Sequence, residues 1–231
     1  MAAKAVLFDF GNTLVSYYRK GEFDSVLERC IKNAADYLNP HGLFYEHDVI
    51  LASAREYNTE REDLKVTPIE NRLAALFSLT ATHQNLMPGL VDAFMAPNLA
   101  AAKVSDGCRE ALENIREKNL YTGIVSNLPW GSPPAPWTNQ LEILGLLKLF
   151  DDITYCMDVG FRKPHPAIFE AALNKAGVSA EEAIFIGDDP VWDVKGALDA
   201  GIQALLYDPE ESQSVSNVPI IRHMSQVLDY C

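Results

Sequence analysis

The stretch Ala5-Val6-Leu7-Phe8-Asp9-Phe10-Gly11-Asn12-Thr13-Leu14 decides the fold of this chain. Its first four residues form a continuous apolar run, which is typical of a strand buried on both faces of a parallel sheet. The run ends on a carboxylate, Asp9, and a Gly-Asn-Thr turn follows at once. Ligands of open α/β sheets bind outside the carboxyl ends of the strands. Asp9 is therefore either a turn residue or a candidate nucleophile or metal ligand.

Similar short apolar runs recur along the chain and alternate with helical patterns. Strands are predicted at Tyr121–Val125, Ile153–Cys156, Ala183–Ile186 and Ile202–Tyr207, with a further one at Val218–Ile221. Helices are predicted at Asp106–Glu117, Trp137–Leu146, Pro166–Ala176 and Asp193–Ala200. Apolar strands with intervening helices indicate an α/β fold, a doubly wound parallel sheet covered on both faces.

Residues 17–97 interrupt this alternation, because they contain only helical patterns. Helices are predicted at Asp24–Leu38, Glu46–Glu60 and Pro68–Leu79. We therefore expect a core, residues 1–16 and 98–231, and a smaller helical domain, the cap, residues 17–97, inserted after the first strand. We expect the cap to lie over the carboxyl edge of the sheet.

Composition narrows the class of protein and its partners. The 231 residues carry a formal net charge of −13 and show no basic stripe, which argues against a nucleic-acid partner. No apolar stretch is long enough for a membrane span, and no cleavable signal precedes Asp9, so we expect no membrane partner. The four cysteines are widely spaced, without a Cys-x-x-Cys pair, which favours reduced thiols and a cytoplasmic location. The composition does not distinguish a monomer from a homodimer.

Polar residues follow the other predicted strands where a ligand would bind. Ser126 and Asn127 follow the second strand, Lys163 follows the third, and an acidic Asp188-Asp189 pair follows the fourth, with Asp193 close behind. Taken singly, these residues also suit a turn, a solvated loop lysine and a helix cap. Together they supply oxygens for Mg²⁺, a cation for phosphate and an attacking carboxylate, the set needed for magnesium-assisted phosphoryl transfer.

In this order the motifs resemble those of the haloacid dehalogenase-like (HAD) hydrolase superfamily, and the helical insertion resembles that family's first-position cap. The resemblance implies that Asp9 forms an aspartyl-phosphate and that Ser126, Asn127 and Lys163 bind the phosphorylated substrate, with Asn12 as a further candidate. It also implies that Mg²⁺ is the cofactor. Its implied ligands are Asp9, the Gly11 carbonyl and Asp188, completed by Asp193 or Asp189.

Gly11 departs from the pattern of the family's phosphatases. Most of them carry a second aspartate two residues after the nucleophile, which protonates the leaving oxygen and later activates water. Glycine offers a carbonyl oxygen to a metal but no proton. Asp189, Asp158 and Tyr17 are the candidates for supplying that proton instead.

The resemblance leaves several functions open. We expect a Mg²⁺-dependent phosphatase or phosphotransferase acting on a small phosphorylated metabolite. A dehalogenase of the same superfamily needs no acidic cluster, and a phosphonate-cleaving enzyme needs a reactive cap lysine, for which Lys20, Lys32 and Lys65 are available. Loss of the acid–base aspartate also suits a phosphate-binding module that turns nothing over.

The sequence also offers candidates for substrate selection. Tyr17 and Tyr18 follow the first motif and either face the substrate or pack at a hinge. The proline-rich loop Leu128–Trp137 leaves the sheet directly after Ser126-Asn127. Its two tryptophans, Trp130 and Trp137, either pack on the surface or face the catalytic edge.

Overall fold

The computed structural model describes residues 3–19, 21–57, 59–212 and 217–231. Its main sheet has six parallel strands in the order β5-β4-β1-β6-β7-β8. These strands are β1 Ala5–Phe8, β4 Tyr121–Ser126, β5 Asp152–Tyr155, β6 Ala183–Gly187, β7 Gln203–Tyr207 and β8 Ile220–Ile221. The prediction of an α/β fold with a parallel sheet is confirmed.

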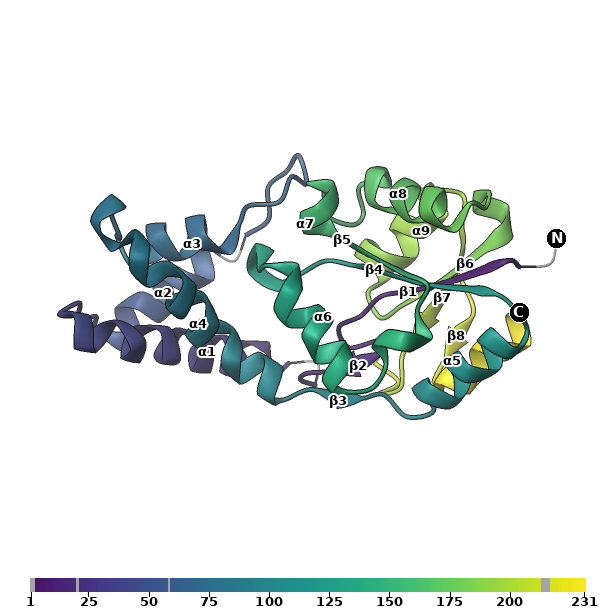
Figure 1. Ribbon diagram of the computed structural model, residues 1–231, viewed down its shortest axis with the longest axis horizontal. Helices are drawn as coiled ribbons and strands as arrows, with labels where there is room; N and C mark the ends of the chain where they lie inside the picture. The colour runs from purple at the N-terminus through teal and green to yellow at the C-terminus, as the bar shows by residue number, and fades with distance from the viewer. Residues whose placement is uncertain (1–2, 20, 58, 213–216) are drawn as a thin grey trace.

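Helices cover both faces of this sheet. Figure 1 shows α8 and α9 on one side and α5 and α6 on the other. The helices of the core are α5 Cys108–Glu117, α6 Pro134–Ile143, α7 Cys156–Val159, α8 Pro166–Ala176 and α9 Gly196–Asp199. Short 3₁₀ turns lie at 129–131, 147–149, 180–182 and 224–230, and a π-helical turn lies at 190–195.

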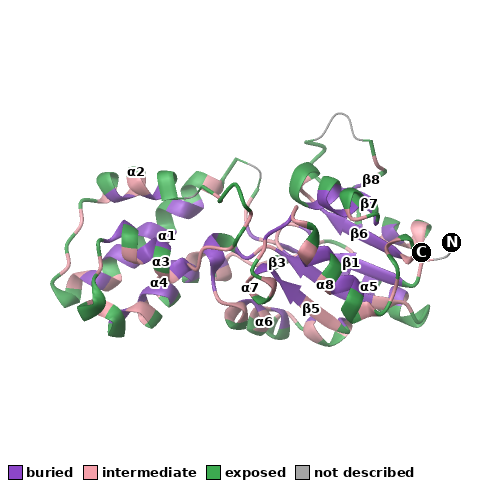
Figure 2. Ribbon diagram, turned by 90° about the horizontal axis from the view of Figure 1, so that it is seen from above, coloured by how far each residue is buried: buried purple, intermediate pink, exposed green. Residues whose placement is uncertain are grey.

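The first strand occupies the middle of the sheet and is fully buried. Ala5 pairs with Tyr121 of β4 on one side and with Ala183 of β6 on the other, and both registers continue to Phe8. All four residues of β1 are buried, and Figure 2 shows the strands as the buried centre of the core. Because these three strands are parallel and adjacent, the residues that follow them meet at one edge.

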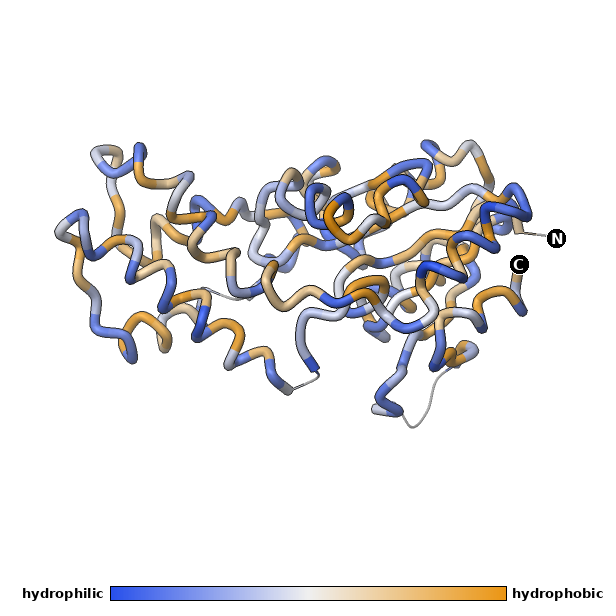
Figure 3. The backbone as a smooth tube through the Cα atoms, turned by 60° about the horizontal axis from the view of Figure 1, so that its bottom comes forward, coloured by the Kyte–Doolittle hydropathy of each residue, from blue (hydrophilic) through white to orange (hydrophobic). Residues whose placement is uncertain are grey.

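The inserted segment consists of four helices: α1 Phe23–Leu38, α2 His47–Tyr57, α3 Ile69–Leu76 and α4 Met87–Ala100, with 3₁₀ turns at 39–41 and 81–86. Figure 3 shows apolar and hydrophilic residues alternating along them, as expected for helices that bury one face. Against the prediction, α2 ends at Tyr57 rather than residue 60, and residues 59–68 leave the helix and reach the core.

Helix α4 is absent from the sequence prediction. Pro88, Gly89 and Pro97 all suggest a break, and the predicted cap ends at residue 97. The structure continues α4 through Pro97 to Ala100. The glycine has a packing role, because a Cβ at Gly89 would lie 2.3 Å from the Tyr37 hydroxyl of α1. Glycine therefore allows α4 to pack closely on α1.

Two connections hold the cap against the core. A two-stranded antiparallel sheet, β2 Val15–Ser16 with β3 Lys103–Val104, joins the two ends of the insertion. Elsewhere, the cap segment 64–66 pairs with core residues 160–162. There the Val66 amide donates to the Gly160 carbonyl over 3.0 Å, and the Arg162 amide donates to the Leu64 carbonyl over 2.9 Å. The cap is thus attached on two sides of the space above the sheet.

Two further predicted helices begin earlier in the structure than in the sequence prediction. Helix α6 begins at Pro134, not Trp137, because prolines fit the first helical turn, where amide hydrogens have no helical partner. The predicted helix from Asp193 starts instead as the π-helical turn at Pro190, where Asp189 is the N-cap.

Among the described residues, no helix combines the length and apolar character required to cross a membrane.

Candidate active site

A cavity of about 920 Å³ lies at the carboxyl edge of the sheet, between the core and the cap. The core contributes the residues that follow its strands, including Asp9, Ser126, Lys163, Asp188 and Asp193. The cap side contributes Tyr17, Tyr18, Gly21, Phe23, Glu60 and Asn98. The cap therefore lies over the edge where the sequence places the chemistry, and a substrate in this cavity would contact both parts.

Asp9 is buried at the end of β1 and is held by two donors from other strands. The Ser126 hydroxyl donates to Asp9 Oδ1 over 2.9 Å, and Lys163 Nζ lies 2.6 Å from the same oxygen. Both donors reach Oδ1, which orients the carboxylate. Asp9 is thus in direct contact with two other predicted site residues, each more than 100 positions away in the sequence.

Lys163 is the cation of the site. Its Nζ also lies 2.7 Å from Asp193 Oδ1 and donates to the Val125 carbonyl over 2.9 Å. Burial alone lowers the pKa of Lys163, but the Asp193 and Asp9 carboxylates outweigh it and raise that pKa above its usual range. The ammonium therefore stays charged, and it can neutralise a phosphate that enters beside Asp9.

Asp9, Asp188 and Asp193 form an acidic cluster in which one oxygen of each carboxylate lies within 4.8 Å of the others. Burial, together with the charges of Asp193 and Asp9, raises the pKa of Asp188 well above its ordinary value. Burial raises the pKa of Asp193 to about 7 although Lys163 opposes it, and Asp9 adds to the rise. Three carboxylates facing one ammonium leave an excess of negative charge, which a hard divalent cation with oxygen ligands would neutralise. The donor set fits Mg²⁺.

Asp189 and Asp193, the two candidates for completing the metal site, make different contacts in the structure. The Asp189 carboxylate is used as a helix cap, accepting from the Val191 and Trp192 amides over 2.7 Å each. Asp193 instead points into the acidic cluster, and its Oδ2 accepts from the Asp189 amide over 3.1 Å. The geometry favours Asp193 over Asp189 beside a metal.

Two predicted substrate-binding side chains make other contacts. Both polar atoms of the Asn127 amide engage the backbone of Lys163, at 2.8 Å to its nitrogen and 3.1 Å to its carbonyl oxygen. Asn127 therefore positions the lysine. The Asn12 side chain accepts from the Tyr17 amide over 3.2 Å, and Asn12 has a left-handed backbone with φ of 57°. Both residues line the cavity, and their binding of substrate stays a prediction.

Gly11 leaves open space at the position of the missing acid. A Cβ built there would meet only the Tyr17 ring, at 3.9 Å, an ordinary van der Waals distance. Among the proton donors considered, Asp158 caps α7 outside this cavity, whereas Asp189 and Tyr17 line it. Burial, together with the charges of Tyr155 and Asp9, raises the pKa of Tyr17, which keeps its phenol protonated.

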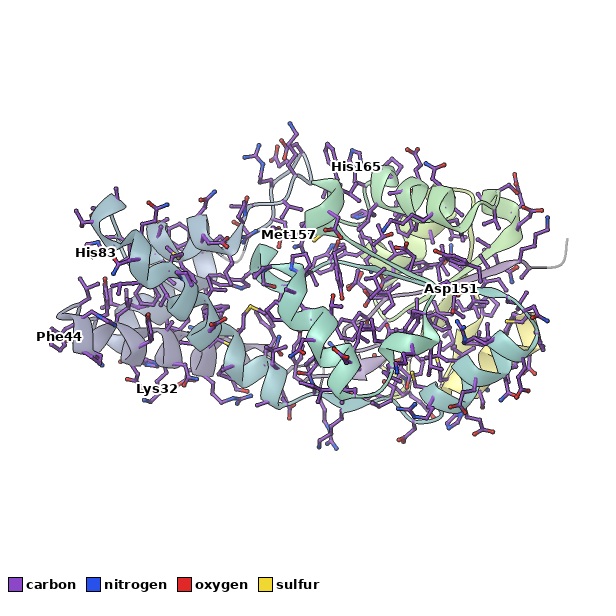
Figure 4. All side chains as sticks on the ribbon, in the orientation of Figure 1. Lys32, Phe44, His83, Asp151, Met157 and His165 are labelled. Atoms are coloured by element: carbon purple, nitrogen blue, oxygen red, sulfur yellow. The ribbon has the colours of Figure 1, made fainter. Side chains whose placement is uncertain are left out.

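The two tryptophans of the proline-rich loop are buried and line the cavity. Trp130 and Trp137 are 4% and 2% exposed, so packing on the outer surface is wrong for both. His165 caps the start of α8 by accepting from the Ala167 amide, where Figure 4 labels it. Phe44, also labelled, lies at the end of the cap remote from the sheet.

Two residues that line the cavity were not predicted from the sequence as site residues: Arg162 and Glu60. They form an ion pair across the boundary between core and cap, with Arg162 Nε 3.3 Å from Glu60 Oε2. Arg162 stands directly before the motif lysine, which was the one available signal. Glu60 lies in a loop and has no periodic pattern around it.

The cap lysines considered for phosphonate cleavage do not reach the site. Lys32 is exposed on α1 and pairs with Asp36, and Lys65 is exposed and lies 3.9 Å from Asp63. Neither lines the cavity. Lys20 lies outside the residues that the structure describes.

Known proteins resemble the chain over nearly its whole length. A ribulose-1,5-bisphosphate 5-phosphatase of Halopiger xanaduensis is 28% identical over 226 residues, covering 93% of this chain and 88% of that protein. A glyceraldehyde 3-phosphate phosphatase of Pyrococcus furiosus is 26% identical over 220 residues, covering 88% of this chain and 80% of that protein. The crystal structure of a HAD phosphatase from Thermococcus onnurineus has the same fold, with a TM-score of 0.70 and 23% identity. The match covers 98% of this chain and 96% of that one.

The family model described as haloacid dehalogenase-like hydrolase matches residues 3–201, which include every residue of the acidic cluster and its lysine. This match extends over most of the chain and over both the core and the cap. With Asp9, Ser126 and Lys163 in contact above the sheet, the chain belongs to the haloacid dehalogenase-like hydrolases.

Proposed function

We propose that the protein is a Mg²⁺-dependent phosphatase that hydrolyses a small phosphorylated metabolite through an aspartyl-phosphate at Asp9. The observation that carries the proposal is the contact of Asp9 with Ser126 and Lys163 beside the acidic cluster. Two curated relatives that cover most of the chain are phosphatases of phosphorylated sugars, which supports this substrate class.

Each residue of the site has a part in this reaction. Because Ser126 and Lys163 hold Oδ1 of Asp9, Oδ2 is the oxygen that attacks phosphorus. The bond from phosphorus to the leaving oxygen breaks, and water then cleaves the acyl phosphate to restore Asp9 and release phosphate. A phosphate oxygen would replace Asp193 as a partner of Lys163 Nζ, and the Ser126 hydroxyl, which has one hydrogen, would turn from Asp9 to the phosphate. Asp9, the Gly11 carbonyl, Asp188 and Asp193 would hold Mg²⁺, which neutralises charge on the transferring phosphoryl group.

The same features weigh against the other functions considered. A dehalogenase of this fold needs the nucleophile and the lysine but has no use for a cluster of three carboxylates. A phosphonate-cleaving enzyme needs a cap lysine in the cavity, and neither Lys32 nor Lys65 lines it. The expected partner is a small molecule rather than nucleic acid or membrane, and the expected location is the cytoplasm. The net charge of −13 weighs against a nucleic-acid partner.

Magnesium is expected to control both activity and stability. Chelation should abolish phosphate release, and added Mg²⁺ should restore it. A ligand at a hundred times its dissociation constant stabilises a fold by about 2.7 kcal/mol. For a protein of this size this raises the melting temperature by about 5–10 °C. Calorimetric melting with and without Mg²⁺, together with phosphate release, measures both effects.

Two aspartate variants test the composition of the metal site. Asp188→Asn should lose activity and the magnesium-induced rise in melting temperature. Asp189→Asn should keep that rise, since asparagine caps a helix as well as aspartate does. Full activity in chelator would refute the phosphatase proposal and favour a dehalogenase.

The leaving group is expected to determine the rate of the wild-type protein. Gly11 supplies no proton to a departing alkoxide, whereas an aryl phosphate leaves without that help. Aryl phosphates should therefore be hydrolysed faster than sugar phosphates. Water attack on the aspartyl-phosphate should also be slow, so rapid-quench assays should show a burst of leaving group close to one equivalent per Asp9.

Equal rates on aryl and sugar phosphates, with no burst, would show that another residue delivers the proton. Tyr17→Phe and Asp189→Asn would then identify it. If no phosphate is released from any compound of a broad panel in Mg²⁺, the protein is a phosphate-binding module and the enzymatic proposal is wrong.

A further inference from the structure

We propose that Arg162, now paired with the cap residue Glu60, is a subsite for a second anionic group of the substrate, a carboxylate or a second phosphate. In this view the Glu60 carboxylate occupies the place of that group until the substrate displaces it. The inference rests on the proposed phosphatase function and specifies which phosphorylated metabolites the site selects.

Two buried cations converge on a single carboxylate at this place. Glu60 Oε2 lies 2.9 Å from an Arg72 terminal nitrogen and 3.3 Å from Arg162 Nε. The arginine side chains are 4% and 6% exposed, whereas that of Glu60 is 23% exposed. Arg72 belongs to α3 of the cap and Arg162 to the core, so the cluster joins the two parts.

The cluster carries an excess of positive charge. Among the residues that the structure describes, the other hydrogen bonds of the two guanidinium groups go to backbone carbonyls: Tyr57 and Thr59 for Arg72, and Leu128 for Arg162. Their remaining contacts are with the uncharged rings of Trp130 and Trp192. In the described part of the chain, Arg72 Nε is buried and has no hydrogen-bond acceptor. Two guanidinium groups with one carboxylate leave one positive charge uncompensated, in a protein whose net charge is −13. A buried charge of this kind favours an incoming anion.

The position of Arg162 suits a group remote from the scissile phosphate. Arg162 directly precedes Lys163, which contacts Asp9, and both residues line the same cavity together with Glu60. Its guanidinium carbon lies 5.7 Å from the centre of the Trp192 ring, a cation–π distance that fixes the group at the cavity wall. A molecule bound to Lys163 at one end therefore meets Arg162 further along the cavity.

Glu60 is the contact of Arg162 that an anion can replace. It stands in the loop that follows α2 rather than inside a helix, and its side chain is the most exposed of the three. A substrate carboxylate or phosphate offers the same planar or forked oxygens that an arginine recognises. The exchange keeps Arg162 paired with the incoming anion, and the Glu60 carboxylate keeps its 2.9 Å contact with Arg72.

Matched substrates test the inference. 3-Phosphoglycerate differs from glycerol 3-phosphate by a carboxylate in place of an alcohol, and ribulose 1,5-bisphosphate differs from ribulose 5-phosphate by a second phosphate. We expect the anion-bearing member of at least one pair to have the higher kcat/KM, and the pair that responds identifies the anion. The quantity to compare is the kcat/KM of the anion-bearing member divided by that of its partner. Glu60→Gln removes the competing carboxylate and should raise this ratio about tenfold.

Two further variants separate recognition from structural support. Glu62→Gln removes one negative charge from the same loop at an exposed position and should leave the ratio unchanged. Arg162→Gln should bring the ratio close to one, whatever happens to the absolute rates. If Arg162→Gln does not fold, the response of Glu60→Gln still decides, because its amide keeps a hydrogen-bond acceptor for both arginines.

Binding measurements distinguish failure of this inference from failure of the phosphatase proposal. Calorimetric titration of Asp9→Asn with the same four compounds reports recognition without turnover. Tighter binding of the anion-bearing members, weakened by Arg162→Gln in that background, supports the subsite even if the wild-type protein hydrolyses none of them. Equal affinities within both pairs, or a Glu60→Gln variant that changes kcat/KM equally for both members, would overturn the subsite. Glu60 would then only hold the cap loop against the core.

Discussion

Replacing Asp9 with asparagine is expected to lower turnover of every phosphorylated substrate by roughly 10⁴-fold or more. The amide is a poor nucleophile, and the buried position beside Ser126 and Lys163 admits no substitute. The fold should survive, because the amide oxygen still accepts from Ser126 and because Lys163 keeps its pairing with Asp193. One negative charge fewer in the acidic cluster also reduces the repulsion within it.

Steady-state release of phosphate and a thermal melt measure these two effects on the same sample. Asp92→Asn is the matched control, since it makes the same substitution at an exposed position on α4. Residual turnover within a factor of ten of the wild-type protein would exclude Asp9 as the nucleophile. A variant that fails to fold is to be replaced by Asp9→Glu, which keeps the charge and displaces the attacking oxygen.

Introducing an acid at position 11 should raise turnover of alkyl phosphates by about 10²- to 10⁴-fold, the usual contribution of general acid–base catalysis. The substitution Gly11→Asp is permitted by the structure, because the new Cβ meets only the Tyr17 ring at 3.9 Å and the backbone there is not left-handed. Aryl phosphates should gain far less, since their departure needs little protonation. The burst should shrink as water attack is accelerated.

The variant Gly11→Asn distinguishes acid catalysis from the steric effect of adding a side chain at position 11. It adds nearly the same volume but no transferable proton, so it should not reproduce the gain on alkyl phosphates. Equal effects of the two substitutions, or a loss of activity in both, would show that glycine at this position is required for another reason. The ratio of alkyl to aryl rates is the decisive quantity, because it is independent of the amount of active protein.

The strands and the central site could be predicted because their signals are local. A run such as Ala5–Phe8 is apolar in every residue and ends in a turn, and the topology of parallel sheets brings the residues after such runs together. Helix α4 was missed because Pro88, Gly89 and Pro97 are breakers by composition, while its stability comes from packing on α1. Tertiary contacts override local preference there.

The finer features of the site depend on contacts between distant segments. Asp189 and Asp193 both follow the fourth strand closely in the sequence, and their contacts distinguish them: Asp189 caps a helical turn, whereas Asp193 lies in the acidic cluster. The pairing of Glu60 with Arg162 joins a cap loop to a core loop, and no periodicity marks either residue. Asn127 is predicted to bind substrate, and its contact with the backbone of Lys163 is a further role that the sequence does not reveal.

The short ladder between β2 and β3 has an evolutionary consequence. Val15 pairs with Val104 and Ser16 with Lys103, so the insertion leaves the core and returns to it at neighbouring positions. The entropic cost of closing a loop rises only with the logarithm of its length, about 0.6 kcal/mol for each doubling. Residues between these strands can therefore be gained, lost or exchanged in a lineage at little cost to the sheet. Strand β1 can stay constant across descendants whose caps, and hence whose substrates, have diverged.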